Sequence, residues 1–446
     1  MEYWENFEGG KYWIKGIDQL TNKLFYDSLS VSQAELDSFF YEREAEIAHI
    51  DSAINAGELI IPYDTVAMDY VVPFPQVHNA QRLLFLKGLK EIEFLNENEL
   101  IKTVELLLKF LDQLFNSIPN RILTFYHGQI GLSYVGILIE LIVNDPAISN
   151  RCRLIIHEMN MNFRKKNFNI LERYYPPYLR LTIDRYKNAP EIQSLIPDLY
   201  FKEKSKSLFI DSLKYSPDQL DSLAWNHQEI FMDGFTKQVD NISKPFEDLY
   251  RENCKRNFSK IQFERKIEEI PMPKFDLQNY GIERLKFISE NYGLFNKPEK
   301  DDLLLEVVEF YINLWVWVVA TGLPTDQGWD MFQRGFSEFV KYDLAVISLA
   351  LRLYEEENHT WPNTLSHPFF DKIRFLNKDP FNNFRPFRMA RKGNNIVIYS
   401  YGVDRKNNHG NDLLSPIIIK QKLDIRETGD PPLQLNEIGI NLIPFY

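Results

Sequence analysis

The chain has 446 residues, of which 44% are hydrophobic and 14% aromatic, and its formal net charge is -12. This composition excludes an intrinsically disordered chain, and the length allows two or three domains. Because an acidic surface repels phosphate backbones, we expect no nucleic acid partner. Cys152 and Cys254 are too few for a disulfide framework, and the sequence leaves open whether they pair.

The N-terminal residues, MEYWENFEGGKYWIKG, are acidic where a signal peptide is basic, so the chain as given carries no recognisable export signal. Two apolar stretches are candidates for membrane helices. Residues 122–139 lack charge but contain three glycines, and residues 310–323 are short and end before Pro324. A membrane helix needs roughly 20 predominantly apolar residues, so both stretches are predicted to be buried helices.

The first part of the chain is predicted to be helical. Residues 98–115 carry an apolar stripe at three- and four-residue spacings, with charged residues on the opposite face. The stripe consists of Leu100, Val104, Leu107, Leu108, Leu111 and Leu114. Asn98 is the N-cap candidate, residues 79–95 form the preceding helix of a hairpin, and residues 122–139 follow. Consecutive helices of this kind predict a helical bundle or an irregular α-solenoid.

The second part of the chain changes in texture. Prolines punctuate residues 170–220, where we place any subdivision of the helical part, and helical patterns resume at 301–320 and 337–358. After Trp361 and Pro362, short β-type runs occur at 394–402, 416–425 and 438–446. The sequence therefore predicts an all-helical domain over 1–335, followed over 336–446 by an α+β domain with one long helix and a small antiparallel sheet.

Three segments of this last part carry a family resemblance: ALRLYEEENHTWPNTL (350–365), KDPFNNFRPFRM (378–389) and IYSYGVDRKNNHGND (398–412). In order and spacing they resemble the C-terminal module of type II secretion major pseudopilins. In that family a helix ends at an aromatic–Pro pair, a Lys/Arg–Asp–Pro–aromatic step enters the sheet, and a Tyr–Ser–x–Gly–x–Asp strand end opens a calcium loop. The helical region before it, including 61–84, is similar to uncharacterised bacterial proteins that end in this module and usually start with a membrane anchor.

The resemblance directs attention to the loop at 399–412, which is rich in Gly, Asn and Asp. Ca²⁺ takes about six to eight oxygen ligands from carboxylates, amides and carbonyls. The candidate ligands are the side chains of Asp404, Asn407, Asn408, Asn411 and Asp412, with backbone carbonyls near Tyr401 and Val403. The resemblance implies that Asp404 and Asp412 lead this set. Nearby positive charges oppose a dication, so an Asn/Gly-rich turn without metal is the open alternative.

Other patterns point to chemistry less strongly. Glu46 with His49 and Glu356 with His359 have the spacing used by di-iron helices, but solvated helical faces explain them more simply. A hydrolase reading would use His127 and Ser133, although Ser133 lacks the G-x-S-x-G pattern. In that stretch, Gly128, Gly131 and Gly136 are expected to allow close helix packing.

Two further motifs have a structural explanation. His157 and Glu158 do not make a zinc motif, because position 161 is Met. Residues 384–395 interleave phenylalanines with basic side chains, which superficially resembles a nucleic-acid surface, and are expected to form a strand pair.

The sequence thus predicts a non-enzymatic bacterial protein that acts through a protein partner at the cell envelope or secretion apparatus. It would lie on the extracytoplasmic side and contact the membrane if an anchor precedes Met1, and in the cytoplasm otherwise. Calcium is the cofactor considered. Two alternatives stay open: a hydrolase with its site in the helical domain, and a cytoplasmic helical scaffold. The oligomeric state is not predicted.

Overall fold

The computed structural model describes residues 32–57, 74–117, 122–173, 244–270, 326–411 and 438–445. These residues belong to two compact units. The first comprises residues 32–57, 74–117, 122–171, 330–411 and 438–445, and the second residues 172–173, 244–270 and 326–329. The first unit is mainly helical and contains a small three-stranded antiparallel sheet, as the sequence predicts.

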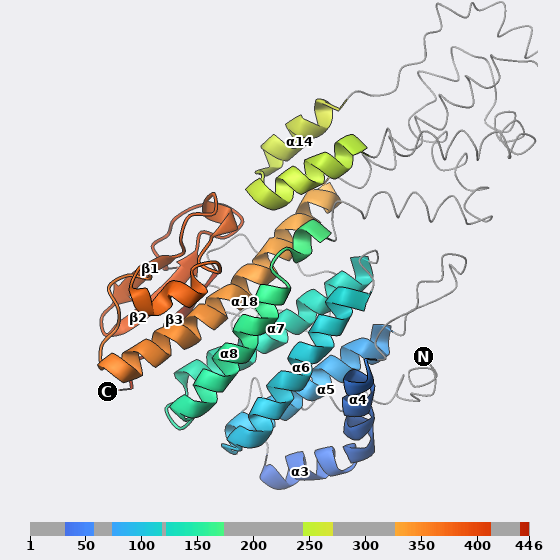
Figure 1. The fold of residues 1–446 in the computed structure, drawn as a ribbon, viewed down its shortest axis with the longest axis vertical. Coiled ribbons are helices and arrows are strands. Elements are labelled where there is room, and N and C mark those ends of the chain that lie inside the picture. The colour runs from blue at the N-terminus through green and yellow to red at the C-terminus, as the bar shows by residue number, and fades with distance from the viewer. Residues whose placement is uncertain are drawn as a thin grey trace, which may run out of the picture. The chain divides into compact units, whose positions relative to one another are not determined.

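The first unit follows the chain in this order (Figure 1): α3 (Gln33–Tyr41), α4 (Glu44–Ala56), α5 (Phe74–Glu93), α6 (Glu97–Ser117), α7 (Ile122–Asn144), α8 (Asn150–Lys166), α18 (Asp326–Asn358, whose first residues belong to the second unit), η4 (Pro368–Ile373), η5 (Pro380–Asn382), β1 (Arg388–Lys392), β2 (Asn395–Ser400) and β3 (Ile438–Leu442). The predicted helix at 301–320, the run at 416–425 and the apolar stretch at 310–323 lie outside the described residues.

The α5–α6 hairpin is confirmed. All six residues of the predicted α6 stripe are buried, with exposures of 5% or less, while Lys102, Glu105 and Lys109 on the other face are exposed. The N-cap prediction was wrong, because α6 begins at Glu97 and Asn98 lies in its first turn. Glu97 and Glu99 in that turn place negative charge at the positive end of the helix dipole, which stabilises the helix.

Glycines in α7 set its distance from α6. A Cβ built at Gly128 would overlap the ring of Phe115, and one at Gly131 would overlap Leu111. At these two positions the expectation of close packing is confirmed. α7 is the buried helix that the sequence predicts, and among the described helices none is both long and apolar enough to cross a membrane.

The long helix α18 contributes many buried residues to the first unit. The apolar stripe that the sequence predicts on 337–358 consists of Phe339, Tyr342, Val346, Leu349 and Leu353. The first four are buried, and Leu353 is partly exposed. The helix ends at Asn358, and His359 follows with φ +53°, a left-handed conformation common where helices stop. The predicted domain boundary at 335–336 lies inside this continuous helix, and a separate folding of the two parts stays a prediction.

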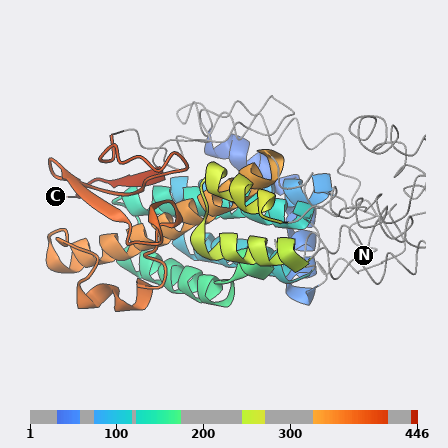
Figure 2. The same cartoon turned by 90° about the horizontal axis from the view of Figure 1, so that it is seen from above.

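The sheet lies beside α18 and has the strand order β1–β2–β3 (Figures 1 and 2). Strands β1 and β2 form a hairpin in which Lys392 pairs with Asn395, and Gly393 between them has φ +62°. A glycine at the first central position of a two-residue turn suits the type II′ geometry. Five of the six residues of the central strand β2 are buried, so this strand forms the core of the sheet.

Polar ties join the helices of this unit to one another and to the sheet. Arg164 of α8 donates from Nε and Nη2 to the two carboxylate oxygens of Asp343 in α18, over 2.7 and 3.2 Å. At the end of α7, the side chain of Asn144 donates to the carbonyl of Asn441 and accepts from the backbone N–H of Ile443. The sheet is therefore fastened to α7 at the strand that lies at its edge.

The second unit is described in less of its length. Residues 244–256 are helical, and α14 (Lys260–Glu268) follows. Ser259 and Gln262 form a capping box at the start of α14. Trp329 donates from its indole nitrogen to the carbonyl of Phe258 over 3.2 Å, and Phe263 is fully buried.

Candidate functional site

The buried carboxylate of Asp379 is the centre of the α+β part. Its side chain has no exposed surface. Oδ1 accepts hydrogen bonds from Ser400 Oγ at 2.6 Å and from the N–H of Phe381 at 2.9 Å, and Oδ2 accepts from the N–H of Tyr401 at 3.1 Å. The backbone N–H of Asp379 donates to the carbonyl of Arg385. One side chain thus joins the Lys-Asp-Pro-Phe step to the end of β2.

Burial shifts the ionisation of this carboxyl. Desolvation raises the pKa of Asp379 to about 6, while the three hydrogen-bond donors and the guanidinium of Arg405 act in the opposite direction. A raised pKa of this kind occurs at catalytic sites and also in buried structural networks. The hydrogen bonds of Asp379 are those of a structural network.

The loop that follows β2 is a series of tight turns held by its own side chains. Asp404 Oδ1 accepts from the N–H of Lys406, and Asn407 Oδ1 accepts from the N–H of His409, both over 3.0 Å. The hydroxyl of Tyr399 also donates to Asn407 Oδ1. Arg405 has a positive φ of 58°. These Asx turns are the arrangement expected of an Asn- and Asp-rich turn.

The last part of the loop is held by a lysine from the β1–β2 hairpin. Lys392 Nζ donates to the carbonyl of Gly410 and to Asn411 Oδ1, the latter over 3.1 Å. The ammonium therefore lies against Oδ1 of Asn411, one of the candidate calcium ligands. No local sequence pattern assigns Lys392 to this loop, because it lies 18 residues before Gly410.

The candidate calcium ligands in the described part of this loop take part in contacts within the protein. The side-chain oxygens named above at Asp404, Asn407 and Asn411 accept from protein donors. Val403 is buried, Tyr401 lies under the guanidinium of Arg388 at 5.8 Å, and Asn408 accepts from the N–H of Asn411 through its carbonyl. Within the described segments no group of three His, Cys, Asp or Glu residues could hold a metal. Asp412 lies outside those segments, and calcium binding stays a prediction.

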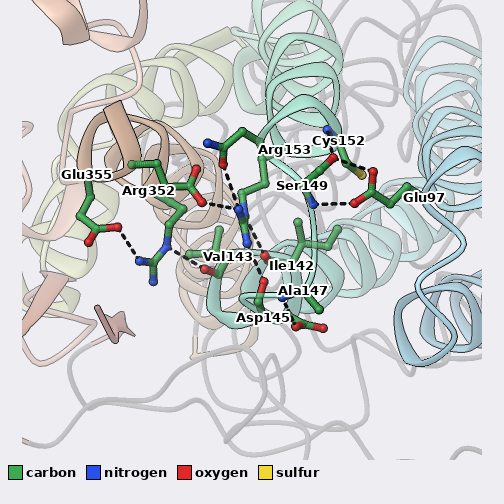
Figure 3. A network of polar contacts seen from close by, with 12 residues as sticks. Glu97, Ile142, Val143, Asp145, Ala147, Ser149, Cys152, Arg153, Arg352 and Glu355 are labelled. Atoms are coloured by element: carbon green, nitrogen blue, oxygen red, sulfur yellow. Dashed lines mark hydrogen bonds and ion pairs between the residues drawn. The ribbon is translucent and has the colours of Figure 1, made fainter. Parts of the chain in front are cut away.

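A second polar centre lies at the C-terminal end of α7, and Figure 3 shows its two arginines together. Arg153 of α8 donates to the carbonyl of Ile142 over 3.2 Å, and Arg352 of α18 donates to the carbonyl of Val143 over 2.9 Å. The last carbonyls of a helix lack partners within the helix. Two guanidiniums meet that need here and place positive charge at the negative end of the helix dipole.

Both arginines are ion-paired inside the protein. Arg153 is 1% exposed and pairs with Glu356, while Arg352 has no exposed side-chain surface and pairs with Glu355 over 2.9 Å. The ring of Phe445 lies 5.0 Å from the guanidinium carbon of Arg153 and 3.7 Å from that of Arg352. This arrangement fastens three separate parts of the chain together.

The residues of the di-iron and zinc patterns lie on separate helices and at a helix end. Glu356 is engaged by Arg153, and His359 is exposed beyond the end of α18. Glu46 and His49 lie on α4, both partly exposed. Desolvation lowers the pKa of His157 to about 4, with the charge of Lys372 as the smaller cause.

The other candidates take up structural positions. Ser133 donates to Glu338 of α18, which also pairs with Lys341, whereas the side chain of His127 lies outside the described residues. The strand pair expected within 384–395 is confirmed as β1 and the start of β2. Its Arg391 donates to the carbonyl of Trp361 over 3.2 Å. The thiols of Cys152 and Cys254 are free and buried, and burial raises the pKa of Cys152 to about 12.

Comparison with known proteins adds no name to these features. No protein-family model, curated protein or solved structure matches the chain.

Proposed function

We propose that the chain is a non-enzymatic bacterial protein that acts by binding another protein, and that its α+β part is a pseudopilin-like module working at the envelope or secretion apparatus. The observation that carries the proposal is the carboxylate of Asp379. It bonds Ser400 and Tyr401, and so joins the Lys-Asp-Pro-Phe step to the Tyr-Ser-Tyr-Gly strand end. These are two of the three sequence elements on which the resemblance rests.

The third element is attached to the same sheet. Trp361, from the aromatic–Pro pair after α18, donates from its indole nitrogen to the carbonyl of Asn394 over 3.2 Å. Asn394 lies in the turn of the β1–β2 hairpin. Segments that resemble the pseudopilin module in sequence are thus joined by hydrogen bonds within one small unit, which supports their reading as a single module.

The hydrolase alternative is less well supported by the same structure. The hydroxyl of Ser133 donates to Glu338, whose carboxylate also accepts from the ammonium of Lys341. A serine nucleophile needs a base that takes its proton, whereas the carboxylate of Glu338 already binds the ammonium of Lys341. This polar group ties α7 to α18.

The experiment is proximity labelling in a bacterium that encodes the chain. A labelling enzyme fused to the full-length gene product should mark proteins of the envelope or secretion apparatus. Asp379→Ala, which leaves three buried donors unpaired, should lose that labelling. Asp371→Ala, an exposed carboxylate in the same part of the chain, should retain it.

Two results would contradict the proposal. Labelling confined to cytoplasmic proteins would favour the helical scaffold. Hydrolysis of a panel of esters and amides by the purified chain, lost in Ser133→Ala, would favour the hydrolase.

A further inference from the structure

The amino group of Lys392 lies at the end of the loop after β2, although Lys392 itself belongs to β1. Its two oxygen partners, the carbonyl of Gly410 and Oδ1 of Asn411, are 18 and 19 residues further along the chain. We propose that the ammonium of Lys392 is the built-in cation of the described loop residues 399–411, and that it holds Gly410 and Asn411 in the place of a metal ion. The inference does not depend on the proposed interaction role.

The hairpin directs the lysine to this position. Lys392 is the last residue of β1, and it is paired in register with Asn395 across the turn. The turn residue Gly393 has φ +62°, which allows β2 to return directly beside β1. The loop begins at the far end of β2 and returns to the hairpin, where the carbonyl of Gly410 accepts a hydrogen bond from the ammonium of Lys392.

The loop end is also fixed from its own side. Gly410 has φ +70°, and a Cβ built on it would lie 3.1 Å from Cγ1 of Val397 and 3.4 Å from Cδ1 of Tyr399. The backbone at Gly410 therefore packs directly on side chains of β2. A glycine is needed there both for the conformation and for the close approach. This packing fixes the carbonyl that Lys392 contacts.

The chemistry of the two oxygens is that of a cation site. A lysine ammonium has three N–H donors and no acceptor, and it forms strong, charge-assisted hydrogen bonds to carbonyl oxygens. Earlier in the loop, Asp404 Oδ1 and Asn407 Oδ1 accept from backbone N–H groups of the loop itself. The side-chain oxygens of Asp404, Asn407 and Asn411 thus each accept a hydrogen bond from a donor of the chain.

The test measures hydrogen exchange of the loop amides by mass spectrometry, using peptides that cover residues 399–411 of the full chain. In the unaltered protein, EDTA or millimolar calcium chloride should leave the exchange unchanged. Lys392→Met removes the ammonium but keeps an apolar stem of similar length. It should speed exchange of these peptides by about tenfold, since a hydrogen bond to a charged group is lost.

Two variants act as controls. Lys406→Met makes the same change in charge at an exposed position in the same loop and should leave the exchange unchanged. Lys392→Arg keeps a positive charge and N–H donors, and should retain most of the protection. Circular dichroism establishes that each variant is folded.

Two outcomes would overturn the inference. One is loss of protection in the unaltered chain with EDTA, restored by calcium, which would make the loop a metal site. The other is exchange in Lys392→Met equal to that of the parent chain. The EDTA measurement uses the unaltered protein, so it decides the question even if Lys392→Met does not fold.

Discussion

At the scale of single residues, long-range polar partners decide the structure of the α+β part. The sequence singles out the Lys-Asp-Pro-Phe and Tyr-Ser-Tyr-Gly segments as motifs, but it assigns no role to Asp379. Its partner Ser400 is 21 residues away, and the hydrogen bond between them requires the β-hairpin to be formed first. A local pattern cannot encode such a contact. The same holds for Lys392 and the loop that it closes.

Asp379 should make the stability of the protein depend on pH. Its pKa in the folded chain, about 6, lies above the ordinary value of 3.8. The folded state therefore binds the proton more tightly, and the group's contribution to the free energy of unfolding is present below about pH 4 and is lost as the pH rises through about 6. As the pH rises from below about 4 to neutrality, the free energy of unfolding of the parent, relative to that of Asp379→Asn, should fall by about 3 kcal/mol.

Urea unfolding at several pH values between 4 and 7 measures this difference. Asp371→Asn, at a carboxylate whose side chain is 57% exposed, should give a nearly constant difference from the parent. A difference for Asp379→Asn that instead grows with pH would show that the three donors outweigh burial and hold the pKa of Asp379 below its ordinary value.

At the scale of elements, periodicity carries most of the information. Within α6 and within α18, apolar residues recur every three or four residues. The sequence alone therefore predicts both helices and their buried faces. The limits of the helices are less local. α6 begins at Glu97 rather than after Asn98, and α18 starts at Asp326, ahead of the predicted 337–358. A helix end depends on which neighbours can satisfy its terminal groups, and those neighbours come from other elements.

The contact between α6 and α7 leaves no room for a side chain at Gly128. Gly128→Ala should lower the free energy of unfolding by about 1–3 kcal/mol, because the added methyl group overlaps the ring of Phe115. Denaturant unfolding measures the loss. The double variant with Phe115→Leu, which removes the overlapping ring atoms, should lose less than the sum of the two single changes. A Gly128→Ala protein as stable as the parent would show that the helices separate at little cost.

At the scale of the whole molecule, buried ion pairs join segments that are far apart in sequence. Arg153 and Glu356 are 203 residues apart, and Arg352 bonds the carbonyl of Val143 across 209 residues. Neither arginine stands out in the sequence, because each lies in an ordinary helical pattern. The helical class and the small sheet could be predicted from local patterns, whereas the contacts that bring α7, α8 and α18 together could not.

Removing one of these charges should be costly. Arg153→Met leaves Glu356 without its cation and the carbonyl of Ile142 without a donor, so the free energy of unfolding should fall by about 3–5 kcal/mol. Arg153→Met combined with Glu356→Gln removes the uncompensated charge and should recover part of the loss. Chemical denaturation of the two variants tests this expectation. A change below about 1 kcal/mol for Arg153→Met would mean that the pair contributes no more than one on the surface.

The polar ties along α18 have a mechanical consequence. Asp343 is held by Arg164 of α8, and Arg352 by the end of α7, at points more than two turns apart on one helix. Sliding or rotating that helix would break a buried ion pair at the first point and a buried hydrogen bond at the second. Tension applied to β3 would reach α7 through Asn144 and be shared with α8 through α18. The first unit should therefore resist shear as one stiff body, and yield by abrupt rupture instead of gradual stretching.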